Sequence, residues 1–131
     1  MVYLRGDLGA GKTTLAQGFV HACGILGPVR SPTYALLQLY PLGGKTLVHL
    51  DLYRLRGAEE LEQLGLTEWA TPDCLWLIEW PERGGASLPP ADLTVALSVG
   101  TVGHTAQLSA GTPLGEAWLA RLAALRGEDC S

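Results

Sequence analysis

The stretch that decides the fold of this chain is Gly6-Asp-Leu-Gly-Ala-Gly-Lys-Thr13, which fits the phosphate-binding pattern G-x-x-x-x-G-K-[ST]. Its glycines let the loop turn back on itself, so that several backbone N–H groups point at one anion. A helix that begins where the loop ends adds the positive end of its dipole. Lys12 would then reach the β- and γ-phosphates of a nucleotide, and the Thr13 hydroxyl would bind Mg²⁺.

The residues on either side of the loop agree with this interpretation. Val2 to Arg5 has the apolar character of a strand, and Thr13 to Ala22 that of a helix. The alternative is a glycine-rich turn that carries a surface lysine. A chance match to the pattern in a chain of this length has a probability on the order of one percent or less. The sequence therefore predicts that the chain binds a nucleoside phosphate.

Length and composition indicate one small domain over residues 1–131. The chain has 131 residues, 47% of them hydrophobic, which is enough for a single core. Its net charge is −4, its two lysines are Lys12 and Lys45, and it has no Lys/Arg-rich run, which argues against a large direct nucleic-acid footprint. The three cysteines are widely spaced and form no C-x-x-C pair, so we expect reduced thiols. No signal peptide or membrane-spanning apolar run is present.

Helices and strands are expected to alternate along the chain, as an α/β fold requires. Residues 41–45 are expected to turn one strand into the next as an antiparallel hairpin, and Gly100 and Gly103 to join a second hairpin. Thr112 and Pro113 have the character of a helix start. Strands are expected over residues 35–40, 46–51, 74–78, 93–99 and 105–109, and further helices over 58–64, around 67–70, and from 113 to about 126.

Two acidic residues, Asp51 and Glu79, each follow an apolar strand. Magnesium bound to a phosphate loop needs a carboxylate nearby, usually at the carboxyl end of a neighbouring strand. An acid at the end of a buried strand is costly unless it is paired or metal-bound. One of the two could hold the magnesium while the other orients an attacking water. A helix cap or an ion pair with Arg54 is the structural alternative.

The identity of the nucleotide is indicated by an absence. GTPases of the Ras type bind guanine through an Asn-Lys-x-Asp motif, and this chain contains no asparagine. ATP is therefore the expected nucleotide. Arg30-Ser-Pro-Thr33 is either a switch, in which Thr33 offers its hydroxyl to the γ-phosphate or metal, or a plain turn.

Taken together, the motifs resemble those of the bacterial TsaE (YjeE) family, the ATPase of tRNA threonylcarbamoyladenosine biosynthesis. The resemblance runs from Val2 to about Leu97. It implies an α/β P-loop NTPase fold, with a mixed central sheet flanked by helices. It also implies a cytosolic protein that binds ATP and Mg²⁺, hydrolyses ATP slowly and acts on the TsaB–TsaD complex, and through that complex on tRNA. The motifs are Gly6 to Thr14, Ser31 to Tyr34, His49 to Leu55, Glu59 to Leu61 with Leu64-Gly65, and Ile78 to Glu82.

The resemblance also implies roles for individual residues. It assigns the loop from Leu8 through Gly9, Ala10 and Gly11 to Lys12 and Thr13 to phosphate binding. Thr13 and Glu79 become the magnesium ligands, which favours Glu79 over Asp51 as the direct metal partner. Thr33 becomes the switch threonine and Asp51 the strand-end acid, while Trp80 and Glu82 lie beside the nucleotide. His49 shares a strand face with Asp51 and is expected to pack or to support the site, not to act as a base.

The chain departs from the family at two places. Members carry a longer segment before the phosphate-loop strand, with an extra strand and helix, whereas here Met1 almost adjoins that strand. If the segment is absent, we expect an uncovered sheet edge and weaker ATP binding. In addition, Gly103-His104 occupies a region where the family tends to place an arginine.

Two other functions remain open at this stage. A small P-loop kinase would use the same loop but needs an acceptor pocket and an arginine-rich lid, and Arg54, Arg56 and Arg83 are few and scattered. A nucleotide-gated binding module would bind ATP with negligible hydrolysis. Turnover with and without partner proteins separates that module from an ATPase.

Overall fold

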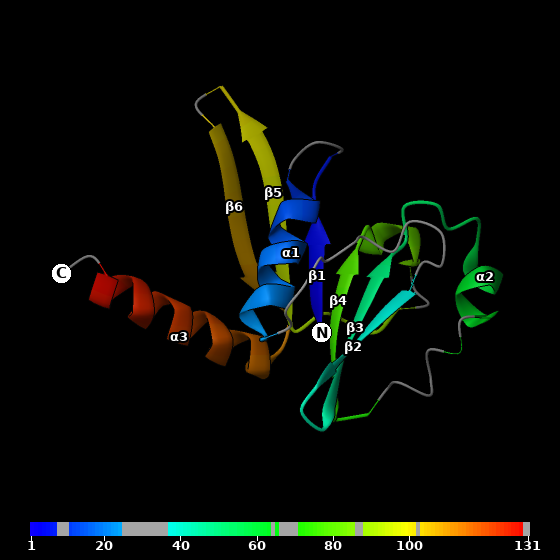
Figure 1. Cartoon of the computed structure of the whole chain (residues 1–131). Helices are drawn as coiled ribbons and strands as arrows, with labels where there is room; N and C mark the ends of the chain where they lie inside the picture. The colour runs from blue at the N-terminus through cyan, green and yellow to red at the C-terminus, as the bar shows by residue number, and fades with distance from the viewer. Residues whose placement is uncertain are drawn as a thin grey trace.

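A computed structural model describes residues 1–7, 11–24, 37–63, 65, 71–85, 88–101 and 103–129. Within these residues it has six strands, three α-helices and one short 3-10 helix (Figure 1). The strands are β1 (Val2–Arg5), β2 (Leu37–Leu42), β3 (Lys45–Asp51), β4 (Cys74–Glu79), β5 (Leu93–Gly100) and β6 (Gly103–Ala110). The helices are α1 (Lys12–Ala22), α2 (Ala58–Gln63), η2 (Pro81–Arg83) and α3 (Pro113–Asp129).

The strands form one mixed sheet in the order β2-β3-β4-β1-β5-β6. The four inner strands β3, β4, β1 and β5 run parallel, and β2 and β6 each pair antiparallel with their neighbour at the two edges. Parallel strands are buried on both faces, which explains the continuous apolar run of β4. Because β1, β3 and β4 run parallel, their carboxyl ends meet at one edge of the sheet.

Both expected hairpins are present, and their strands continue closer to the turns than their sequence patterns suggest. Pro41 belongs to β2 and pairs with Thr46, so the turn is only Gly43-Gly44, with φ angles of 55° and 93°. Proline is tolerated there because β2 is an edge strand with no further partner in the described sheet. Two positive φ angles suit the two-residue turns that match strand twist. The helix expected around residues 67–70 lies outside the described residues.

The sheet separates two layers of core residues because side chains alternate along each strand. On one face Ala16 and Val20 of α1 pack against Val2 and Leu4 of β1 and their neighbours. On the other face Leu61 of α2 joins a second cluster with side chains of β3 and β4. In Figure 1, α1 lies across one face of the central strands, and the β5–β6 hairpin extends beyond it. No helix among the described residues is long and apolar enough to cross a membrane.

The start of α3 is fixed to the loop that precedes β5. The Thr112 hydroxyl accepts a hydrogen bond from the N–H of Gly115 at 3.2 Å, as expected for a cap, and donates to the Asp92 carboxylate at 2.6 Å. Gly115 is buried so closely against this loop that a Cβ there would lie 1.6 Å from the carbonyl oxygen of Asp92. Only a glycine fits at this position.

Replacing Gly115 with alanine is therefore expected to destabilise the chain by about 1–3 kcal/mol, since the backbone of α3 must move away from Asp92. Gly18 is a matched control, because it also lies within a helix but has no atom within 4 Å of its would-be Cβ. Gly18→Ala is expected to be neutral or to stabilise by up to about 1 kcal/mol. Urea unfolding of both variants tests this, and equal stabilities would contradict the close approach.

Candidate active site

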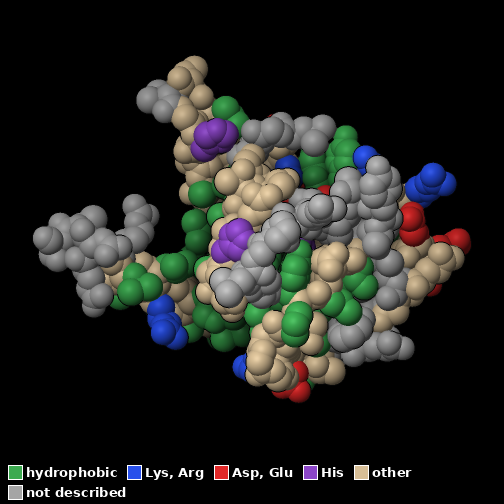
Figure 2. Space-filling view, viewed as in Figure 1, with side chains coloured by type: hydrophobic (Ala, Val, Ile, Leu, Met, Phe, Trp, Pro, Cys, Tyr) green, Lys and Arg blue, Asp and Glu red, His purple; other side chains and the backbone are tan. Residues whose placement is uncertain are grey.

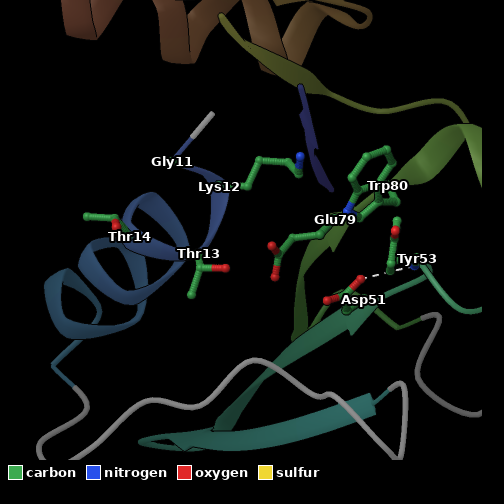
Figure 3. A pocket seen from close by; sticks show the side chains of 8 residues that line it. All are labelled: Gly11, Lys12, Thr13, Thr14, Asp51, Tyr53, Glu79 and Trp80. Carbon is green, nitrogen blue, oxygen red and sulfur yellow. Dashed lines mark hydrogen bonds between the residues drawn. The ribbon is translucent and has the colours of Figure 1, made fainter. Parts of the chain in front are cut away.

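A pocket of about 350 Å³ opens at the carboxyl edge of the sheet, between the start of α1 and the ends of β3 and β4 (Figure 3). Side chains from both sides of the pocket face one another: the Glu79 carboxylate points toward Thr13 and Asp51, and Trp80 lies beside Lys12. The end of the glycine-rich motif, Gly11 to Thr13, and the strand-end acids thus belong to one site. The residues that line it are Gly11, Lys12, Thr13, Thr14, Asp51, Tyr53, Glu79 and Trp80.

The backbone at Gly11 begins α1 in the way the loop pattern requires. Gly11 has a φ of 99°, in the left-handed region where glycine is favoured, and its carbonyl accepts the N–H of Leu15 at 3.0 Å. The first turn of α1 contains no acidic residue. An anion at this helix start would meet the positive end of the dipole without a competing carboxylate in that turn.

Lys12 is only 6% exposed, and its ammonium group is held inside the site. Its Nζ donates to the carbonyl oxygens of Gly6 and Asp7, the latter at 2.9 Å, and lies 4.0 Å from the centre of the Trp80 ring. Burial lowers the pKa of Lys12, and the carboxylates of Glu79, Glu82, Asp51 and Asp7 counteract part of that shift.

Trp80 adopts a backbone conformation that side chains rarely take. Its φ of 58° makes it the only described residue other than glycine with a positive φ. The N–H of Trp80 donates to the Leu4 carbonyl at 3.3 Å, so β1 fixes the bend that follows β4. This bend places the indole against Lys12 on one side and Tyr53 on the other, with the two aromatic ring centres 4.9 Å apart. Such strain is common at functional sites.

Asp51 and Glu79 end adjacent strands in register and differ in environment. Glu79 is 2% exposed, and its Oε2 lies 2.7 Å from Nε2 of the fully buried His49. Asp51 is half-buried and accepts the N–H of Tyr53 at 3.0 Å. Burial raises the pKa of Asp51, and the charge of Glu79 adds to that rise, while the hydrogen bond from Tyr53 opposes it.

The donors in this pocket suit magnesium. A hydroxyl from Thr13 and carboxylates from Glu79 and Asp51 are hard oxygen ligands, which Mg²⁺ prefers. Among the described residues no group of three or more His, Cys, Asp or Glu could hold a metal without other ligands.

The structure brings together most of the expected site residues. Gly11, Lys12, Thr13, Asp51, Glu79 and Trp80 all line the pocket. Glu82 lies exposed on η2 and is not among the lining residues, although its charge acts on Lys12. Leu8, Gly9, Ala10 and Thr33 lie outside the described residues, so their roles stay predictions.

Sequence patterns missed two features of the pocket. Tyr53 lines the pocket beside Trp80. Its position two residues after Asp51, within the motif from His49 to Leu55, could have indicated that it belongs to the site. The contact between Lys12 and Trp80 had no such signal, because it depends on the positive φ at Trp80.

Comparisons with known proteins show which proteins the whole chain resembles. A family model described as threonylcarbamoyl adenosine biosynthesis protein TsaE matches residues 1–106. A Haemophilus influenzae protein named tRNA threonylcarbamoyladenosine biosynthesis protein TsaE is 47% identical over 116 residues, which are 88% of this chain and 73% of that protein. A protein of the same name from Streptomyces coelicolor is 38% identical over 123 residues, 90% of this chain and 82% of the relative.

A solved structure extends the comparison to the fold. The crystal structure of YdiB from Bacillus subtilis matches with a TM-score of 0.78 and 28% sequence identity, over 95% of this chain and 77% of that one. The α/β fold with a mixed central sheet is thereby confirmed.

The raised pKa of Asp51 gives a prediction about stability. The folded-state pKa lies above the unfolded-state value of 3.8, so the ionised carboxylate destabilises the fold at neutral pH. This penalty decreases as the pH falls through the folded-state pKa and is gone below pH 3.8, where the carboxyl group is protonated in both states. Asp51→Asn keeps an acceptor for the Tyr53 N–H and removes the charge. Without nucleotide or metal, we expect this variant to have a higher urea midpoint than the wild type at pH 7. The gain should shrink as the pH falls through the folded-state pKa.

Glu62→Gln, on the exposed side of α2, controls for the loss of one negative charge and should leave the midpoint nearly unchanged. An Asp51→Asn chain that is less stable than the wild type at pH 7 would contradict the prediction.

Proposed function

The chain belongs to the TsaE family of tRNA threonylcarbamoyladenosine biosynthesis, as its motifs predict, and from this premise we propose that it is a magnesium-dependent ATP-binding protein and slow ATPase. The observation that carries the proposal is the convergence of Lys12, Thr13, Asp51 and Glu79 on one pocket. These are the phosphate-binding, metal-binding and water-orienting groups that phosphoryl transfer needs.

ATP would place its phosphates at the start of α1. Backbone N–H groups of the loop would surround the β-phosphate, and Lys12 would move from the Gly6 and Asp7 carbonyls to the β- and γ-phosphate oxygens. The indole of Trp80 and the ring of Tyr53, which line the same pocket, would border the bound nucleotide.

Thr13 and Glu79 would hold the magnesium ion, with Thr33 added from the switch segment. A magnesium ion held there would supply positive charge that offsets the negative charge developing on the phosphate. Asp51 is next to Glu79 on the neighbouring strand, where its carboxylate would orient the attacking water.

The partners proposed are TsaB and TsaD, with tRNA reached through that complex. The net charge of −4 disfavours a large direct tRNA contact. Lys and Arg side chains of the described residues are scattered on the face shown in Figure 2 and form no continuous patch there. A cytosolic location follows from the same proposal, since tRNA modification takes place there.

A nucleotide-gated binding module is the second candidate. Lys12 already contacts two backbone carbonyls and the Trp80 ring. Nucleotide binding would break these contacts and thereby change the conformation around the pocket. In this alternative, the bound state would signal to the partners and hydrolysis would be negligible. A kinase gains no comparable support, because Arg54, Arg56 and Arg83 are exposed.

The two lysines of the chain are expected to differ in their effect on ATP binding. Lys12→Ala is expected to weaken ATP binding about 10- to 150-fold, because it removes charge-assisted hydrogen bonds worth about 1.5–3 kcal/mol. Lys45→Ala, at an exposed strand start, should bind ATP like the wild type. Isothermal titration calorimetry measures both, and equal affinities would contradict a phosphate role for Lys12.

A separate prediction concerns Glu79. Glu79→Gln should still bind ATP in EDTA, but magnesium should no longer improve the affinity, and hydrolysis should be lost. Phosphate release would be measured for the chain alone, then with TsaB, TsaD and substrate tRNA. Partner-stimulated hydrolysis that disappears in Glu79→Gln supports the ATPase. ATP binding without hydrolysis under any condition favours the binding module.

A further inference from the structure

His49 is a fully buried polar residue for which the proposed reaction has no direct use. It lies on β3 two residues before Asp51, and its Nε2 lies 2.7 Å from Oε2 of Glu79 on β4. Both side chains are removed from solvent, at 0% and 2% exposure. A contact this short between buried groups fixes the orientation of both side chains.

The contact also bears on which ring nitrogen of a neutral His49 carries the proton. A carboxylate only accepts hydrogen bonds, so Nε2 must donate to Glu79. Nδ1 is buried and has no partner among the described residues. For a neutral ring beside an ionised Glu79, the contact assigns the Nε2–H tautomer.

From these contacts we propose that His49 is a positioning residue that orients the Glu79 carboxylate for magnesium. Nε2–H occupies Oε2 and thereby leaves Oε1 to turn toward Thr13, the direction in which the carboxylate points in Figure 3. The inference rests on the proposed function, since it gives a reason for the orientation of a carboxylate that serves as a metal ligand.

Histidine suits this position better than other residue types. A lysine or arginine would neutralise Glu79 and weaken its attraction for a cation. A leucine would fill the space but leave Oε2 buried without a donor and the carboxylate free to rotate. The Nε2–H tautomer of histidine donates one hydrogen bond and leaves the negative charge on Glu79.

A pair of amide variants separates positioning from packing. The side-chain nitrogen of glutamine is four bonds from Cα, as Nε2 of histidine is, so His49→Gln can still donate to Oε2. The nitrogen of asparagine is three bonds away, like Nδ1, and falls short of Oε2. His49→Leu removes the donor altogether. Thermal unfolding of all three variants reports any loss of stability separately.

The measurement is the magnesium concentration that half-saturates binding of a non-hydrolysable ATP analogue, followed by calorimetry, with the affinity in EDTA as the reference. We expect His49→Asn and His49→Leu to need about 10- to 100-fold more magnesium, and His49→Gln to stay close to the wild type. Affinities in EDTA should agree among all four chains. If asparagine and glutamine behave alike, or leucine keeps the wild-type magnesium requirement, the positioning role is overturned while the proposed function stands.

A wild-type chain whose analogue binding does not respond to magnesium would overturn the proposed function and this inference together. ¹⁵N NMR of the wild type adds a test that needs no variant to fold. The chain has three histidines, and the buried one should show the Nε2–H tautomer with a slowly exchanging proton. The Nδ1–H tautomer would overturn the assignment.

Discussion

The site depends above all on the parallel register of β1, β3 and β4. Asp51 is the pairing partner of Glu79, and Glu79 in turn pairs with Leu4. Because side chains alternate along a strand, a slip of one residue in β3 would turn Asp51 away from α1 and bring His49 out of reach of Glu79. The apolar residues that alternate with these acids pack into the core on both faces of the sheet, so core packing itself holds the register. Burial elsewhere in the sheet thus positions the chemistry at its edge.

Burial of charged groups at this edge of the sheet lowers the stability of the fold, and the proposed function gives a reason for that cost. Burial raises the pKa of Asp51 and lowers that of Lys12, so each group is less favourable in its charged form than it would be in water. Trp80 adds a strained backbone angle beside them. These costs fall on residues that line the same pocket, whereas the close approach of α3 to Asp92 carries no such cost, because Gly115 has no side chain. A bound polyanion with its cation would offset the first group of costs and leave the rest of the fold unchanged.

Much of the fold and of the site could be predicted from the sequence because both follow from local patterns. The loop motif identifies Lys12 and Thr13, and apolar runs that end in acids identify Asp51 and Glu79. Periodicity also places His49 on the face of Asp51, but it cannot name Glu79 as the partner, since that depends on the register with another strand. The sequence predicts a turn at Pro41 because proline is scarce in strands. Pro41 instead lies in β2, where it is tolerated only because β2 is an edge strand. The positive φ of Trp80 has no local signal at all.

The contacts of Lys12 suggest why such a site would respond to its ligand in two states. In the structure the ammonium group is satisfied by two backbone carbonyls and an indole face. Lys12 would have to give up these three partners to reach a nucleotide. The phosphate must therefore interact with the ammonium group more favourably than they do. Trp80 would lose its contact with the ammonium group at the same step, and it is hydrogen-bonded through its backbone N–H to Leu4 of β1 and packs against Tyr53 with the ring planes tilted by 46°. If a nucleotide binds as proposed, its phosphates would thereby be coupled to the segment that follows β4, and the surface around the pocket would differ between the bound and free states.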